Sequence, residues 1–74
     1  ENDDKGNVVN GNVVTVNTEN CVIEGDKKLI ATVGLRDMII VDTPDATLVS
    51  TKENAGEIKQ VLAKLREEGK NQYL

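Results

Sequence analysis

Residues 6–25, GNVVNGNVVTVNTENCVIEG, decide the fold class, because Gly or Asn recurs ahead of paired β-branched residues. The recurrence is loose, at roughly six residues, and is typical of a β-helix, where each short strand stacks on the coil below. The pair Asn10-Gly11 keeps a second interpretation open, since Asn and Gly accept the positive φ angles of a type I′ hairpin. We favour the β-helix.

Further short runs of branched aliphatic residues follow toward the C-terminus. Together with the first stretch they predict strands at 8–9, 12–16, 21–24, 29–35, 38–42 and 46–50. Turn-forming residues such as Gly25-Asp26 separate these runs. Short strands at this spacing are typical of an all-β stack, sandwich, barrel or β-helix. The sequence therefore predicts a mainly β fold.

The C-terminal part has a helical period instead. An apolar stripe repeats at the spacing of one helix face, and its residues are Ala55, Ile58, Val61, Leu62 and Leu65. The stripe predicts one amphipathic helix over about 53–68. Ser50 with Glu53 and Asn54 with Glu57 are candidate capping boxes, and Gly69 is a candidate C-cap. We expect this helix packing face to cover the β stack, with a partner or dimer contact as the alternative.

The segment VDTPDA, residues 41–46, presents two carboxylates around the only proline. Pro44 lacks an N–H and cannot lie in a central strand, and Thr43 before it is pushed to an extended conformation. Asp42 and Asp45 can each accept a hydrogen bond from a nearby backbone N–H. These residues predict a structural corner between two strands. A metal site would need more converging oxygen ligands, and no EF-hand spacing is present.

Composition excludes several classes of function. The 74 residues carry a net charge of −4 and no His, which excludes a histidine base, a Ser-His pair and a histidine metal ligand. Nucleic-acid binding is not expected of an acidic chain, nor is a membrane span without an apolar run of roughly 20 residues. A single cysteine, Cys21, cannot form an internal disulfide, which favours a reducing, cytoplasmic setting. The chain starts without Met, so we expect a fragment of a longer chain or a processed product.

Other reactive side chains have ordinary structural interpretations. Cys21 lies in an apolar run and is expected to be a buried, inert thiol. Arg36 and Asp37 could form an exposed ion pair. Lys27 and Lys28 follow a turn and could contact a phosphate, although a solvated turn is the simpler expectation. No catalytic, cofactor-binding or metal-binding residue is predicted from spacing and charge.

Three segments resemble the C-terminal part of bacterial mannose-1-phosphate guanylyltransferases. They are GNVV at 11–14, LIATVGLRDMIIVDTPDATLV at 29–49, and the ending LREEGKNQYL at 65–74. The resemblance implies a short left-handed parallel β-helix-like stack followed by one helix. It divides the chain into the end of a linker at 1–7, β-helix strands at 8–51, and a helix and tail at 52–74. It also implies a strand, corner and strand at VDTPDA.

The family makes GDP-mannose and pyrophosphate from GTP and mannose 1-phosphate, in a catalytic domain that uses Mg²⁺ and would precede this segment. No catalytic residue of the family maps onto this chain, and no cofactor is expected here. The resemblance thus implies a non-catalytic structural and oligomerisation domain. Its expected partners are its own catalytic domain and a second copy in a homodimer. A regulatory or ligand-binding module of another sugar nucleotidyltransferase, with Lys27, Lys28 and Arg36 as candidate contacts, is the alternative.

Overall fold

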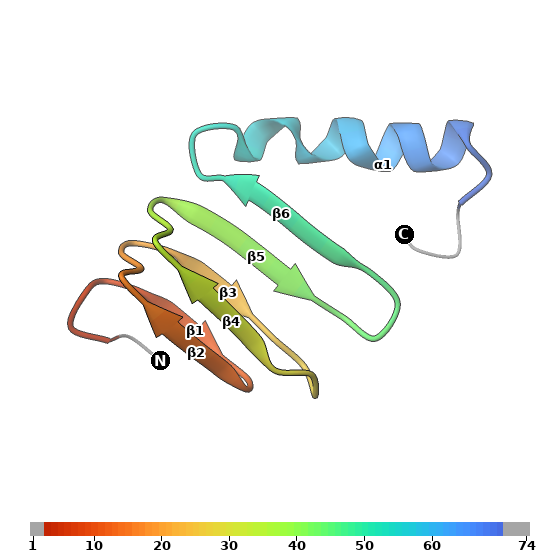
Figure 1. Ribbon diagram of the computed structural model, residues 1–74. Helices are drawn as coiled ribbons and strands as arrows, with labels where there is room; N and C mark the ends of the chain where they lie inside the picture. Colours follow the sequence, from red (N-terminus) through yellow and green to blue (C-terminus); the bar gives the residue numbers. More distant parts are fainter. Residues whose placement is uncertain (1–2, 71–74) are drawn as a thin grey trace.

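A computed structural model describes residues 3–70 and shows stacked strands followed by one helix (Figure 1). The elements are β1 (Val8–Asn10), β2 (Val13–Val16), β3 (Val22–Glu24), β4 (Ile30–Val33), β5 (Met38–Asp42), β6 (Thr47–Thr51), a 3-10 turn (Ala55–Glu57) and α1 (Ile58–Glu67). The outer ends of the predicted linker and tail, residues 1–2 and 71–74, lie outside the described residues. The mainly β fold with a C-terminal helix is confirmed.

The strands form two sheets, one with the order β1-β3-β5-β6 and one with the order β2-β4. The pairs β1–β3, β3–β5 and β2–β4 are parallel, so the chain winds from one sheet to the other and back. Strands β1 and β2 belong to different sheets, which makes the hairpin interpretation of Asn10-Gly11 wrong. Successive parallel strands on successive coils are what the β-helix interpretation predicts.

The coils are not equal in length, because one corner carries an insertion. Val8 pairs with Val22, 14 residues later, whereas Val13 pairs with Ile30, 17 residues later. The difference arises between β3 and β4, where residues 25–29 replace the two-residue link at 11–12. The longer link places Lys27 and Lys28 outside the regular coil.

Two further corners stack residues in the left-handed conformation. Asn20 and Asp37 have φ of 55° and 56° at one corner, and Asn17 and Gly34 have φ of 51° and 71° at the other. Asn, Asp and Gly adopt this region at the lowest cost, which explains their recurrence at the ends of the valine-rich runs. The repeat in the sequence is therefore a repeat of corner geometry.

Gly11 is a glycine that the packing of coils requires. Its φ is +98°, and an added Cβ would lie 2.8 Å from the carbonyl carbon of Gly25 on the next coil. Gly34, with φ of +71° and nothing within 4 Å of an added Cβ, is a matched control. We expect Gly34→Ala to cost about 1–2 kcal/mol for its backbone alone, and Gly11→Ala to cost clearly more. Urea unfolding of both variants tests this, and equal losses would contradict the close approach.

The last strand departs from the parallel order. Strand β6 pairs antiparallel with β5, with Ile40 opposite Val49 and Asp42 opposite Thr47. The turn around Pro44 reverses the chain, because proline cannot continue a ladder and the residue before it is held extended. The stack therefore ends with a hairpin.

The helix begins later than predicted and without a side-chain cap. Ser50 lies within β6, and neither Asn54 nor Glu57 makes a side-chain capping hydrogen bond, so both capping-box predictions are wrong. The C-cap prediction is confirmed: Gly69 has φ of +74°, its N–H donates to Arg66, and the N–H of Lys70 donates to Leu65. This pair of bonds is a Schellman motif, which ends the helix.

The core is small and lies between the two sheets. Cys21 and Ile23 are fully buried and Ile40 is nearly so, while Val13, Ile30, Leu35 and Met38 pack around them. The prediction of a buried Cys21 is confirmed. Its thiol donates to the carbonyl of Glu19 and accepts from the N–H of Met38, both at 3.4 Å.

Candidate functional site

Of the predicted corner residues, Asp42 is the last residue of β5, and Thr43, Pro44 and Asp45 lie in the link from β5 to β6. Thr43 closes the turn: its N–H donates to the carbonyl of Ala46 at 2.9 Å, and its hydroxyl oxygen accepts from the N–H of Ala46 at 3.2 Å. The backbone-binding role expected of Asp42 thus falls to Thr43. The carboxylate of Asp42 instead accepts from the hydroxyl of Thr47 at 2.6 Å.

Asp42 is the buried charge of this corner. Its side chain is 5% exposed, and its Oδ1 also lies 3.4 Å from the ammonium of Lys28, which comes from the inserted link. The hydrogen bond from Thr47 lowers the pKa of Asp42 below its ordinary value; burial opposes this, and Lys28 adds to it. The second oxygen, Oδ2, is buried without a hydrogen-bond partner among the described residues.

The stability of the chain is expected to fall with acid because of this carboxylate. A folded-state pKa below the unfolded one contributes stability above the ordinary Asp value of about 3.8, and the contribution is lost as the pH falls through the folded pKa. We expect Thr47→Val to lower stability at neutral pH and the deficit to shrink below about pH 4. Thr47→Ser, which retains the hydroxyl, is the control. Urea midpoints across pH test this, and a deficit independent of pH would contradict it.

The candidate phosphate-binding cations do not all converge, because Lys27 and Lys28 line one pocket whereas Arg36 lies elsewhere. Lys28 is engaged by Asp42, and Arg36 lies at another corner, 3.8 Å from the carboxylate of Glu19. Among the described residues the ion pair that Arg36 and Asp37 could have formed is absent, and Asp37 lies at a corner with φ of 56°. Asp37 instead accepts from the side-chain amide of Asn20 at 2.6 Å, and the oxygen of that amide accepts from Lys52 at 3.1 Å. These contacts join successive coils at one corner.

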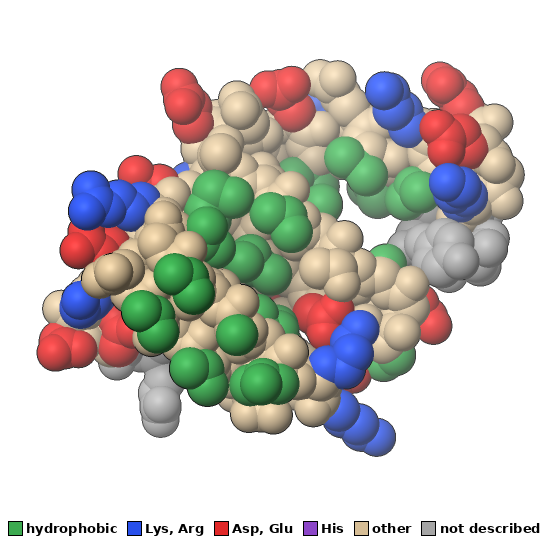
Figure 2. Space-filling view, in the orientation of Figure 1, with side chains coloured by type: hydrophobic (Ala, Val, Ile, Leu, Met, Phe, Trp, Pro, Cys, Tyr) green, Lys and Arg blue, Asp and Glu red, His purple; other side chains and the backbone are tan. Residues whose placement is uncertain are grey.

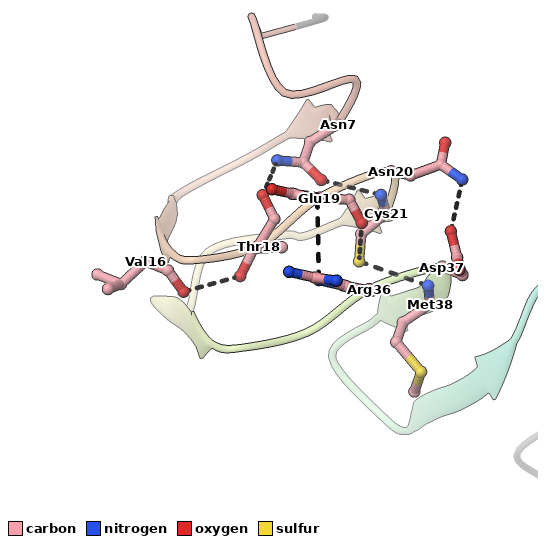
Figure 3. Close-up of polar contacts among 9 residues, drawn as sticks. All are labelled: Asn7, Val16, Thr18, Glu19, Asn20, Cys21, Arg36, Asp37 and Met38. Atoms are coloured by element: carbon pink, nitrogen blue, oxygen red, sulfur yellow. Dashed lines mark hydrogen bonds and ion pairs between the residues drawn. The ribbon is translucent and has the colours of Figure 1, made fainter.

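A buried polar cluster inside the first coils was missed by sequence reasoning. The Asn7 side chain is fully buried; its amide donates to the carbonyl of Thr18 at 2.7 Å and its oxygen accepts from the N–H of Cys21 at 2.9 Å (Figure 3). The hydroxyl of Thr18 meets that of Thr32 at 2.8 Å. The only available signal was Asn7 preceding the first paired valines, which other Asn residues in the chain share.

The outer face of β2 and β4 is apolar and exposed. Its side chains lie opposite those that face the core, because successive residues of a strand point to opposite faces. Figure 2 shows hydrophobic side chains gathered over these strands. The residues of this outer valine face are Val14, Val16, Leu29, Ala31 and Val33. Val33 is 71% exposed and Leu29 59%. Such a contiguous apolar face marks a contact surface.

The predicted helix packing face lies against the outer side of the β5–β6 hairpin. A groove of about 190 Å³ separates them, and it is lined in part by Val41, Leu48 and the helix residues Ile58, Val61, Leu62 and Leu65. Ala55 is half-buried in the 3-10 turn before α1. Val61 remains 44% exposed and Leu62 38%. The hairpin thus covers this face only in part.

Residues 3–70 hold no group of three or more His, Cys, Asp or Glu placed to bind a metal ion. The helix among them is too short and too polar to cross a membrane. The described residues offer ion pairs, turn contacts and apolar surface.

Comparison with known proteins identifies the family of this chain. A family model described as the MannoseP isomerase/GMP-like beta-helix domain matches residues 11–65. The chain is 38% identical over 72 residues to the alginate biosynthesis protein AlgA of Pseudomonas putida, and 37% identical over 71 residues to the mannose-1-phosphate guanylyltransferase of Klebsiella pneumoniae. These alignments cover 97% and 96% of this chain and 15% of each relative.

A solved structure has the same fold. The crystal structure described as mannose-1-phosphate geranyltransferase from Thermus thermophilus matches with a TM-score of 0.78 and 32% identity. The match covers 86% of this chain and 20% of that one. The chain thus spans 15% of the length of the first curated relative, and the family match supports the left-handed β-helix-like fold that the resemblance implied.

Proposed function

Because this chain belongs to the MannoseP isomerase/GMP-like β-helix domain family, we propose that it is a supporting domain of a mannose-1-phosphate guanylyltransferase. In this proposal the whole enzyme makes GDP-mannose and pyrophosphate from GTP and mannose 1-phosphate, in the cytoplasm. The 74 residues do not catalyse. They pack on the catalytic domain and contribute to a homodimer contact.

The observation that carries the proposal is the outer valine face. A small domain that leaves Val14 53% and Val33 71% exposed on one side presents a surface suited to a protein contact. The relatives of this chain are several times longer, which supplies a candidate partner in their remaining polypeptide. In this proposal Mg²⁺ belongs to the catalytic domain.

Deletion and surface variants of the whole enzyme test this proposal. We expect the full enzyme to release pyrophosphate from GTP and mannose 1-phosphate, and a version lacking these residues to remain folded but to turn over more slowly or to be monomeric. The double variant Val14→Ser, Val33→Ser should reproduce part of the defect. Lys59→Ser on the exposed side of α1 is the control. A deletion that keeps full turnover and the full oligomer would exclude the supporting role.

A further inference from the structure

The β-helix has an incomplete end next to β4. The sheet of β1, β3, β5 and β6 continues past the last coil, whereas the other sheet stops at β4. The chain would need another strand beside β4 to complete the coil that β5 begins. It instead reverses at Pro44 and adds β6 to the first sheet. A notch is left between the free edge of β4 and the hairpin, where residues of both line a pocket.

The free edge of β4 carries unpaired backbone groups. The N–H groups of Ile30 and Gly34 donate to carbonyls on the coil of β2 at 2.9 Å, so the alternate residues Ala31 and Val33 direct their N–H and C=O groups to the opposite edge. No described strand pairs with that edge. A free edge of this kind accepts an added strand.

The face of the β5–β6 hairpin that carries Ile40 borders the notch. This face points to the core side of the molecule, yet part of it is exposed. Val49 lies directly opposite Ile40, so the two side chains share one face of the hairpin. Ile40 is buried, while Val49 is 58% exposed. A pocket of about 330 Å³ opens beside Ile40, and residues of both walls line it, including Ile30, Ala31 and Thr47.

Asp42 supplies an independent indication of a missing group. It lines the same pocket, its side chain is only 5% exposed, and its Oδ2 accepts no hydrogen bond from the described residues. A buried carboxylate oxygen without a donor costs free energy. Lys28 already lies beside Oδ1, so a neutral N–H suffices as the missing donor. A backbone amide of an added strand has this chemistry.

We propose that an extended segment of the same enzyme, from outside these 74 residues, lies in the notch as a parallel or antiparallel partner of β4. It pairs with the backbone of Ala31 and Val33, covers Val49, and donates an N–H to Oδ2 of Asp42. Because β5 and β6 continue the first sheet past β4 and flank this position, it favours a single extended strand over a whole second β-helix. The inference rests on the proposed function, since it requires the longer enzyme.

Residue-resolved hydrogen exchange on the whole enzyme tests the proposal. Thr32, whose N–H faces β2, is the internal reference. We expect the amides of Ala31 and Val33 to exchange within about ten-fold of the rate of Thr32 in the whole enzyme, because all three are then paired. In the 74-residue chain they should exchange much faster than Thr32. Amides of Ala31 and Val33 that are unprotected in the whole enzyme overturn the proposal.

A variant and a dilution series identify the occupant. Ala63→Asp, on the exposed side of α1, is the control variant. In the 74-residue chain Val49→Asp should lower the stability no more than this control does. In the whole enzyme only Val49→Asp should raise the exchange rates of the Ala31 and Val33 amides. Protection that appears in the 74-residue chain as its concentration rises would assign the edge to a second copy and overturn the proposal. Pyrophosphate release by the whole enzyme is measured in parallel. Normal turnover with unprotected amides would refute the added strand but leave the proposed function standing. Protected amides without turnover refute the proposed function.

Discussion

Replacing Asn7 with Ala is expected to lower the free energy of unfolding by about 2–5 kcal/mol, because two buried backbone groups lose their partner. These groups are the carbonyl of Thr18 and the N–H of Cys21, and Asn7 is fully buried between them. A chain of this length has roughly 4–11 kcal/mol of stability in total, so the variant should be largely destabilised. Urea unfolding followed by far-UV circular dichroism measures the loss.

Asn10→Ala is the matched control for that substitution. Asn10 also bridges two coils, but its amide donates to the carboxylate of Glu24 at 2.8 Å on the exposed surface. We expect a loss within about 0.5 kcal/mol, since water replaces the contact. Equal losses for the two variants would mean that water also reaches the Asn7 position, and the buried cluster would then have no special weight.

Ile23→Ala is expected to cost about 2–5 kcal/mol, the range for truncating a buried aliphatic side chain. Ile23 is fully buried and lies between Val9 and Ile40 in the register of the first sheet. The fold has few buried apolar residues, so little neighbouring material can move into the cavity. The same urea experiment gives the loss of free energy.

Val33→Ala tests whether that cost comes from burial. Both residues are branched aliphatics in strands, but Val33 is 71% exposed. Its truncation should cost no more than about 0.5 kcal/mol in the 74-residue chain. A large loss of unfolding free energy for Val33→Ala in this chain would show that the outer valine face is already covered, for example by self-association. A loss that grows with protein concentration would identify self-association as the cause.

Much of the fold followed from local chemistry. The recurrence of Gly and Asn ahead of paired valines predicted the coils, because only a few residue types accept the left-handed corners found at Asn17, Asn20 and Gly34. Pro44 predicted a corner between two strands, since it has no N–H to give, but not that the strand after it would run antiparallel. The helical stripe and Gly69 predicted α1 and its end. Each signal acts over a few neighbouring residues.

Tertiary contacts decided the candidate sites. In the run Val13 to Val16 both faces carry valine, so alternation alone does not show that Val13 packs on the core while Val14 and Val16 remain exposed. Likewise, the burial of Asn7 and the Thr47 partner of Asp42 depend on strands from elsewhere in the stack. The sequence by itself determined the corners and the periods, which are local. The exposed valine face and the free edge of β4 exist only because distant segments cover one side and leave the other open.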